Sequence, residues 1–177
     1  MTRRMLVACM GISMVALYAP AVMQVGARDR VLVVYNPSNS VPRGWYRIGR
    51  MEGTASLHVG SFVLARLPAD VATFAAQRGY LQNGVPILKR IGALAPQSVC
   101  VREQAVRVDD VVVANARTHD GVQRPLQAWP QCRTLAVGEL FLLSDTSPAS
   151  FDSRYFGPIS ASAVLGVAQP LWTWSAP

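Results

Sequence analysis

Apolar residues along this 177-residue chain fall mostly into short runs, and Gly, Pro, Asp and Asn separate the runs. Short apolar or alternating runs with such punctuation are typical of β-strands joined by tight turns. The pattern predicts a mainly β fold, and an apolar fraction of 51% is enough to bury a core. We expect strands at 31–35, 61–67, 85–91, 98–101, 105–108, 111–115, 139–144 and 161–168.

Three further segments have recognisable local patterns. Residues 101–116 are typical of a β-hairpin that turns at Asp109 and Asp110. Residues 69–80 predict one short helix, with Asp70 as its N-cap and its end near Gly79. The apolar run 164–174 is too short to cross a membrane and contains Pro170, so we expect a strand followed by a tail.

The N-terminus has the pattern of a membrane segment. Residues 5–23 carry no charge and would span about 28 Å as a helix, close to the thickness of a bilayer core. Arg3 and Arg4 precede this run and favour a cytoplasmic N-terminus. We therefore expect a transmembrane anchor over 1–27 and an exported domain over 28–177. A cleaved signal peptide, processed after Ala21, is the alternative.

The net charge of +7 is spread along the chain without any run of five basic residues. This distribution argues against a nucleic-acid-binding arm and favours weak attraction to anionic lipid. Two cysteines of the expected exported part, Cys100 and Cys132, could form a disulfide there. His58 and His119 lack the spacing of metal ligands, and no cofactor or metal is expected.

Lys89 is the only lysine among the 17 basic residues of the chain. It lies in a strand-like run beside Ile87, Leu88 and Ile91, where burial would lower the pKa of its amine. A neutral lysine can act as a general base for a serine hydroxyl, whereas an arginine cannot. The alternative is a chance lysine on a solvated surface. No G-x-S-x-G motif is present for a histidine to serve, so surface positions are expected for both histidines.

Several motifs together resemble signal peptidase I, the membrane-tethered leader peptidases with a Ser–Lys dyad, and in particular their TraF-type conjugative-transfer branch. The matching stretches cover nearly all of the chain after the expected anchor, and they are NPSNSVPRGWY (36–46), RGYL (78–81), PILKRIGAL (86–94), FDSRYFGP (151–158) and PLWTW (170–174). Two loops depart from the leader-peptidase pattern. Residues 144–146 replace its Gly-Asp-Asn, and residues 95–97 replace its Pro-Gly-Asp.

The resemblance implies a signal-peptidase-like β fold and specific roles for serines. Ser40 would be the nucleophile, and Ser38 would donate its hydroxyl to the oxyanion together with the backbone N–H of Ser40. A turn stiffened by Pro37 and Pro42 would hold both donors near one carbonyl.

The family's basic and supporting residues also map onto this sequence. Lys89 would be the general base, and Ser150 would orient its amine. Asp152 and Arg154 would form a supporting ion pair.

By resemblance, the substrate would be the propilin of a conjugative type IV secretion system, which the enzyme would cleave and could cyclise. The enzyme would be held in the bacterial inner membrane, with its catalytic domain in the periplasm. Pilus-assembly components are possible partners. Two other functions stay open: a general leader peptidase, and a catalytically idle assembly factor of the pilus machinery.

Overall fold

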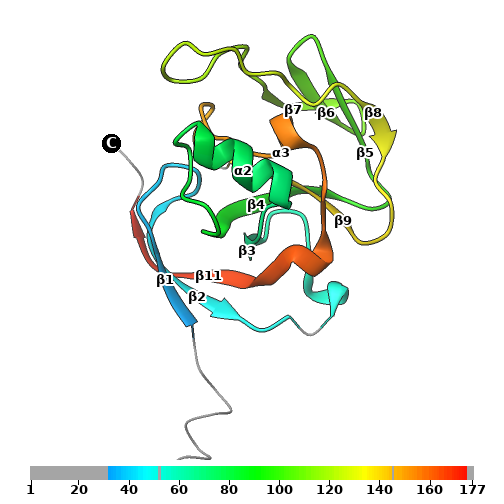
Figure 1. Ribbon diagram of the computed structural model, residues 1–177. Coiled ribbons are helices and arrows are strands. Elements are labelled where there is room, and N and C mark those ends of the chain that lie inside the picture. The colour runs from blue at the N-terminus through cyan, green and yellow to red at the C-terminus, as the bar shows by residue number, and fades with distance from the viewer. Residues whose placement is uncertain (1–31, 52, 145, 175–177) are drawn as a thin grey trace, which may run out of the picture. The chain divides into compact units, whose positions relative to one another are not determined.

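The computed structural model describes residues 32–51, 53–144 and 146–174 (Figure 1). The expected anchor over 1–27 lies outside these residues. Among the helices of the described part, none has the length and apolar character needed to cross a membrane.

The strands of the described chain form two β-sheets (Figure 1). The larger sheet has seven strands in the order β1-β2-β11-β3-β4-β9-β10. Its strands are β1 Leu32–Asn36, β2 Arg43–Gly49, β3 Phe62–Ala65, β4 Ile87–Leu94, β9 Glu139–Leu143, β10 Ile159–Ser160 and β11 Val164–Trp174. The smaller sheet, in the order β7-β6-β5-β8, is inserted between β4 and β9 and consists of β5 Ser98–Arg102, β6 Ala105–Val108, β7 Val111–Asn115 and β8 Cys132–Thr134.

Helical segments are short. Helix α2 spans Ala69–Gln77 and α3 spans Ser153–Phe156, and single 3₁₀ turns lie at Thr54–Ser56 and Ala161–Ala163. The mainly β prediction is confirmed, and so is the hairpin between β6 and β7. Asp109 and Asp110 form its turn with φ angles of 47° and 66°, which Asp tolerates better than most residues.

Several predicted boundaries are wrong. The strand predicted at 85–91 is β4, which runs from Ile87 to Leu94, and the strand predicted at 161–168 begins only at Val164, after a 3₁₀ turn. The N-cap of α2 is Pro68, and Asp70 lies in the first turn, where its charge complements the helix dipole. The segment predicted as a C-terminal tail belongs to β11, which pairs with β2 as far as Trp174. Pro170 is tolerated because β3 pairs only with the first half of β11 and the register shifts between Pro170 and Trp172.

The strands β2, β8 and β10 and the helix α3 were not expected from the sequence pattern. Gly44 explains part of β2, because a side chain there would clash with the Trp172 carbonyl oxygen of β11 and its φ of 139° suits glycine. Asp152 caps α3 by accepting the Arg154 N–H at 3.2 Å. A disulfide joins Cys100 of β5 to Cys132 of β8.

The core of the larger sheet determines where Lys89 lies. Ile87 and Ile91 of β4 pack in one buried apolar cluster with Val63 and Leu142 of neighbouring strands. Lys89 lies midway between the two isoleucines, and side chains two residues apart share a face of a strand. The amine therefore starts from a buried, apolar face, and only 4% of the Lys89 surface is exposed.

Candidate active site

The turn between β1 and β2 presents two serines beside β4. Ser38 is exposed and Ser40 is half-buried. The Ser40 N–H lies 3.4 Å from Ser38 Oγ, so a hydroxyl and a backbone donor are placed side by side. Such a pair can bind the oxyanion of an acyl-transfer reaction.

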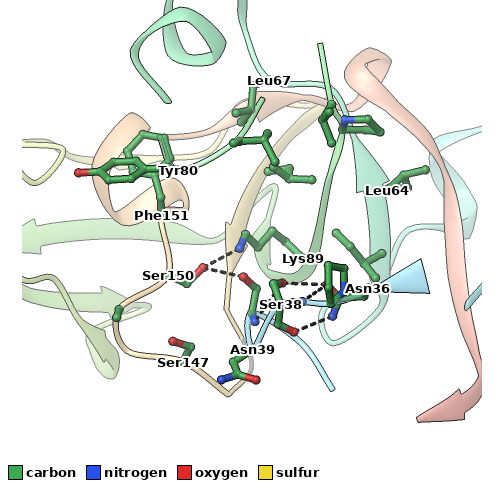
Figure 2. A pocket seen from close by; sticks show the side chains of 18 of the residues that line it. Asn36, Ser38, Asn39, Leu64, Leu67, Tyr80, Lys89, Ser147, Ser150 and Phe151 are labelled. Atoms are coloured by element: carbon green, nitrogen blue, oxygen red, sulfur yellow. Dashed lines mark hydrogen bonds between the residues drawn. The ribbon is translucent and has the colours of Figure 1, made fainter. Parts of the chain in front are cut away.

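Ser150 connects the lysine with the second of these serines. Lys89 Nζ donates to Ser150 Oγ at 2.6 Å, and Ser150 Oγ donates to Ser40 Oγ at 3.2 Å. Figure 2 shows the side chains of Lys89 and Ser150, which both line one pocket, pointing toward each other. Three separate parts of the chain thus connect the Lys89 amine to the Ser40 hydroxyl through Ser150.

The Lys89 amine is suited to act as a base. Burial lowers its pKa from 10.5 to about 8, and the nearby Arg154 guanidinium adds to this, while the carboxylate of Asp152 opposes it. An appreciable fraction of the amine is therefore neutral near pH 7–8.

A second loop holds the serine turn in place. Ser144 Oγ donates to the Ser40 carbonyl at 2.8 Å, and Thr146 Oγ1 donates to the Asn39 carbonyl. Ser144 Oγ also accepts the Ser147 N–H at 2.9 Å. Ser144 and Thr146, which belong to a stretch where the sequence departs from the leader-peptidase pattern, therefore support the serine turn.

Asp152 and Arg154 form a buried ion pair behind Ser150. Arg154 Nε lies 2.7 Å from Asp152 Oδ1, and the two side chains are 3% and 0% exposed. The guanidinium also donates to the carbonyls of Ser150 at 2.9 Å and Pro148 at 3.0 Å. The pair therefore fixes the backbone that presents Ser150.

An apolar cavity of about 750 Å³ opens beside these groups. Figure 2 shows Leu67, Tyr80 and Phe151 lining it near Lys89. Its walls come from β1, the serine turn, the segment before β4, and the loop ahead of α3. An apolar cleft next to a serine and an amine of lowered pKa has the form of a site that can bind apolar groups beside a reactive hydroxyl.

Comparison with known proteins identifies the family. Residues 3–174 match the family model described as "Signal peptidase, peptidase S26". The chain belongs to this family of peptidases.

Curated relatives agree with the family assignment. The chain is 30% identical to "Plasmid transfer protein TraF" of Escherichia coli, over 87% of this chain and 90% of that protein. It is also 30% identical to "Conjugal transfer protein TraF" of Agrobacterium fabrum, over 98% and 99%. A crystal structure of a signal peptidase I from Enterococcus faecalis aligns with a TM-score of 0.39 and 22% identity, covering 63% of this chain and 96% of that one.

In this S26 chain the fold brings the residues that the motifs singled out to one place. Ser38, Ser40, Lys89 and Ser150 line the cavity, and Asp152 and Arg154 lie behind Ser150. His58 and His119 are exposed and do not line it. Sequence reasoning missed the contributions of Asn36, Ser144 and Thr146. The sequence held a signal only for Asn36, because Asn directly before Pro favours the start of a turn.

Loss of the buried ion pair is expected to destabilise the S26 domain strongly. Arg154→Ala would leave the Asp152 carboxylate buried without its partner, which costs about 3–5 kcal/mol of unfolding free energy. The matched control is Arg133→Ala, which breaks a pair whose side chains are 37% and 28% exposed and should cost about 0–1 kcal/mol. Denaturant unfolding of both variants measures the difference, and equal costs would contradict a structural role for the buried pair.

Proposed function

We propose that this protein is a serine endopeptidase in which Ser40 is the nucleophile and Lys89 the general base. The observation that carries the proposal is the contact chain from Lys89 through Ser150 to Ser40, together with the lowered pKa of the buried amine. A serine hydroxyl is a weak nucleophile without a base, and a neutral lysine supplies one.

The proposed reaction begins with acylation. The neutral Lys89 amine takes the Ser40 proton as Oγ attacks the carbonyl carbon of the peptide bond, and Ser150 keeps the amine in position. The oxyanion receives hydrogen bonds from the Ser38 hydroxyl and the Ser40 N–H. The C–N bond then breaks, and the Lys89 ammonium returns its proton to the leaving amine.

Deacylation completes the cycle. Water attacks the acyl-enzyme, Lys89 accepts a proton from it, and the carboxylic product leaves as Ser40 regains a hydrogen. A free amine of the substrate could attack in place of water and form a new peptide bond, which would cyclise the product. No step of this scheme uses a cofactor.

The acylation rate is expected to depend on pH through the Lys89 amine. Its neutral form is the reactive one, so the rate should fall about tenfold per pH unit below a midpoint near the pKa of about 8 and level off above it. Single-turnover cleavage between pH 6 and pH 10 measures this profile. A midpoint near 10.5 would contradict a buried base, and one near 6.5 that disappears in His119→Gln would assign the base to histidine.

The substrate is proposed to be the propilin of a conjugative type IV secretion system. The names of the TraF relatives support a role in plasmid or conjugal transfer, and the motifs that resemble the conjugative-transfer branch suggest its propilin substrate. Co-expression of the full chain with each candidate pilin, followed by intact-mass spectrometry, tests it. A pilin shortened at one site supports the proposal, and a further loss of 18 Da indicates cyclisation. Unchanged pilins alongside processed secretory preproteins would instead show a general leader peptidase.

The bacterial inner membrane is the proposed location, with the catalytic domain in the periplasm. Besides the uncharged run at residues 5–23, exposed aromatic side chains gather where β1, β2 and β11 pair, at Tyr35, Trp45, Trp172 and Trp174. Tyr35 and Trp45 are 5.1 Å apart between ring centroids. Tyr and Trp are favoured at the interface between lipid and water.

A fusion of alkaline phosphatase to the C-terminus tests this location. We expect the fusion to be active and to sediment with membranes, because Arg3 and Arg4 keep the N-terminus cytoplasmic. Active fusion in the soluble periplasmic fraction, with a mature N-terminus at Val22, would show a cleaved signal peptide instead of an anchor.

A further inference from the structure

Asn36, the last residue of β1, has a buried amide that no step of the proposed reaction uses. Only 6% of its surface is exposed. Its Nδ2 donates to the carbonyl oxygens of Ser38, Val41 and Pro42 at 3.0, 3.2 and 3.2 Å. The amide therefore joins the beginning of the serine turn to its end.

The oxygen of the same amide holds Ser38. Asn36 Oδ1 accepts the Ser38 backbone N–H at 3.1 Å and the Ser38 hydroxyl at 2.8 Å, and Figure 2 shows the two side chains joined. Ser38 Oγ in turn accepts the Ser40 N–H at 3.4 Å. Both proposed oxyanion donors thus belong to one chain of hydrogen bonds that ends at Asn36.

We propose that Asn36 is a positioning residue that accepts the hydrogen bond of the Ser38 hydroxyl in the resting enzyme and gives this hydrogen bond up to the oxyanion during acylation. Because Ser38 is itself a proposed oxyanion donor, this inference rests on the proposed function. The hydroxyl needs only to rotate about its Cβ–Oγ bond, and Ser38 Oγ stays in place.

The energetics of this rotation favour an amide as the resting acceptor. A hydrogen bond to an ionised oxygen is roughly twice as strong as one to a neutral oxygen, so the developing oxyanion attracts the proton away from Asn36. Asn36 Oδ1 still accepts the Ser38 N–H, and no buried acceptor is left without a donor.

Asparagine combines two properties that other residues of its size lack. An aspartate would accept from Ser38 more strongly and would place a negative charge near the oxyanion. It would also lose the N–H groups that reach the three carbonyls. A leucine would lack both the acceptor and the donors. The position therefore requires a neutral side chain that donates and accepts at once.

A double-mutant cycle between Asn36 and Ser38 tests the inference. The full chain in detergent is mixed with a peptide spanning the pilin cleavage site found by co-expression, and single-turnover acylation is measured. In the wild-type background we expect Asn36→Ala to slow acylation about 10- to 100-fold, with the half-saturating enzyme concentration changed less than threefold and the pH midpoint unchanged. In the Ser38→Ala background we expect further slowing of less than threefold, because the hydroxyl that Asn36 positions is gone.

Tyr46→Phe is the matched control, because the Tyr46 hydroxyl donates to the Pro42 carbonyl of the same turn at 2.6 Å. We expect it to slow acylation less than threefold. Equal slowing by Asn36→Ala in both backgrounds would overturn the inference and reduce Asn36 to a support of the turn. A shifted pH midpoint would also overturn it, since Asn36 would then act on Lys89. If Ser38→Ala alone acylates at the wild-type rate, the oxyanion assignment fails and the inference falls with it.

If Asn36→Ala does not fold, Asn36→Asp provides the decision. It keeps the size of the side chain and both acceptor contacts to Ser38. We expect acylation at least about tenfold slower in the wild-type background, because the carboxylate retains the hydroxyl, but less than threefold slower in the Ser38→Ala background, where only the lost contacts to the three carbonyls remain. Acylation by Asn36→Asp at the wild-type rate would contradict the proposal that Asn36 gives up the hydrogen bond of the Ser38 hydroxyl to the oxyanion.

Discussion

Lys89→Arg is expected to reduce single-turnover acylation by at least about 10³-fold, although it keeps the positive charge of the side chain. A guanidinium cannot give up its proton in a protein and so cannot accept one from Ser40. Ser40→Ala should be equally inactive, and the double variant no worse, because the two residues act in one step. Cleavage that survives in Lys89→Arg would exclude Lys89 as the base.

Lys89→Met shows whether the loss of acylation comes from the missing base or from a failure to fold. The fold lowers the pKa of the amine from 10.5 to about 8, so the unfolded chain binds more protons between these values. Wild-type stability should therefore rise by about 3 kcal/mol between pH 8 and pH 10.5, and stay at its lower level below pH 8. Lys89→Met should lack this rise, and it should be inactive yet folded at neutral pH.

Ser38→Ala is expected to slow acylation by roughly 10²–10³-fold, equivalent to about 2.7–4 kcal/mol of transition-state stabilisation. Ser38 is exposed, and losing its bond to Asn36 should cost only about 1 kcal/mol of stability. Ser38→Thr keeps a hydroxyl and should retain more activity than Ser38→Ala.

Single-turnover kinetics with the pilin peptide and thermal melts of both variants measure these two effects separately. Near-wild-type acylation by Ser38→Ala would make Ser38 a residue of the turn alone. The Ser40 N–H would then need another partner in the oxyanion site.

The strand pattern in the sequence was sufficient to predict much of the fold and the buried position of Lys89. Apolar residues at Ile87 and Ile91 place Lys89 on the buried face of a strand, and the structure has it there. The turn at Asp109 and Asp110 was also apparent, because aspartates between apolar runs favour a hairpin. These features depend on residues close together in the chain.

Features that depend on distant residues could not be predicted from local pattern. The continuation of β11 through Pro170 depends on the side from which β2 and β3 pair with it. The bond from Ser144 to the Ser40 carbonyl joins residues 104 apart in the sequence. The five hydrogen bonds of the Asn36 amide depend on the path of the serine turn, which the prolines restrict but do not determine.

The most direct measurement of the central claim is the site of acylation. The full chain is mixed with the pilin peptide, quenched in acid within the first turnover, and digested for peptide mapping by mass spectrometry. We expect the acyl group on Ser40 in the wild type, and no adduct in Lys89→Arg under the same conditions. An acyl group on another residue, or an unchanged adduct on Ser40 in Lys89→Arg, would contradict the proposed Ser40–Lys89 mechanism.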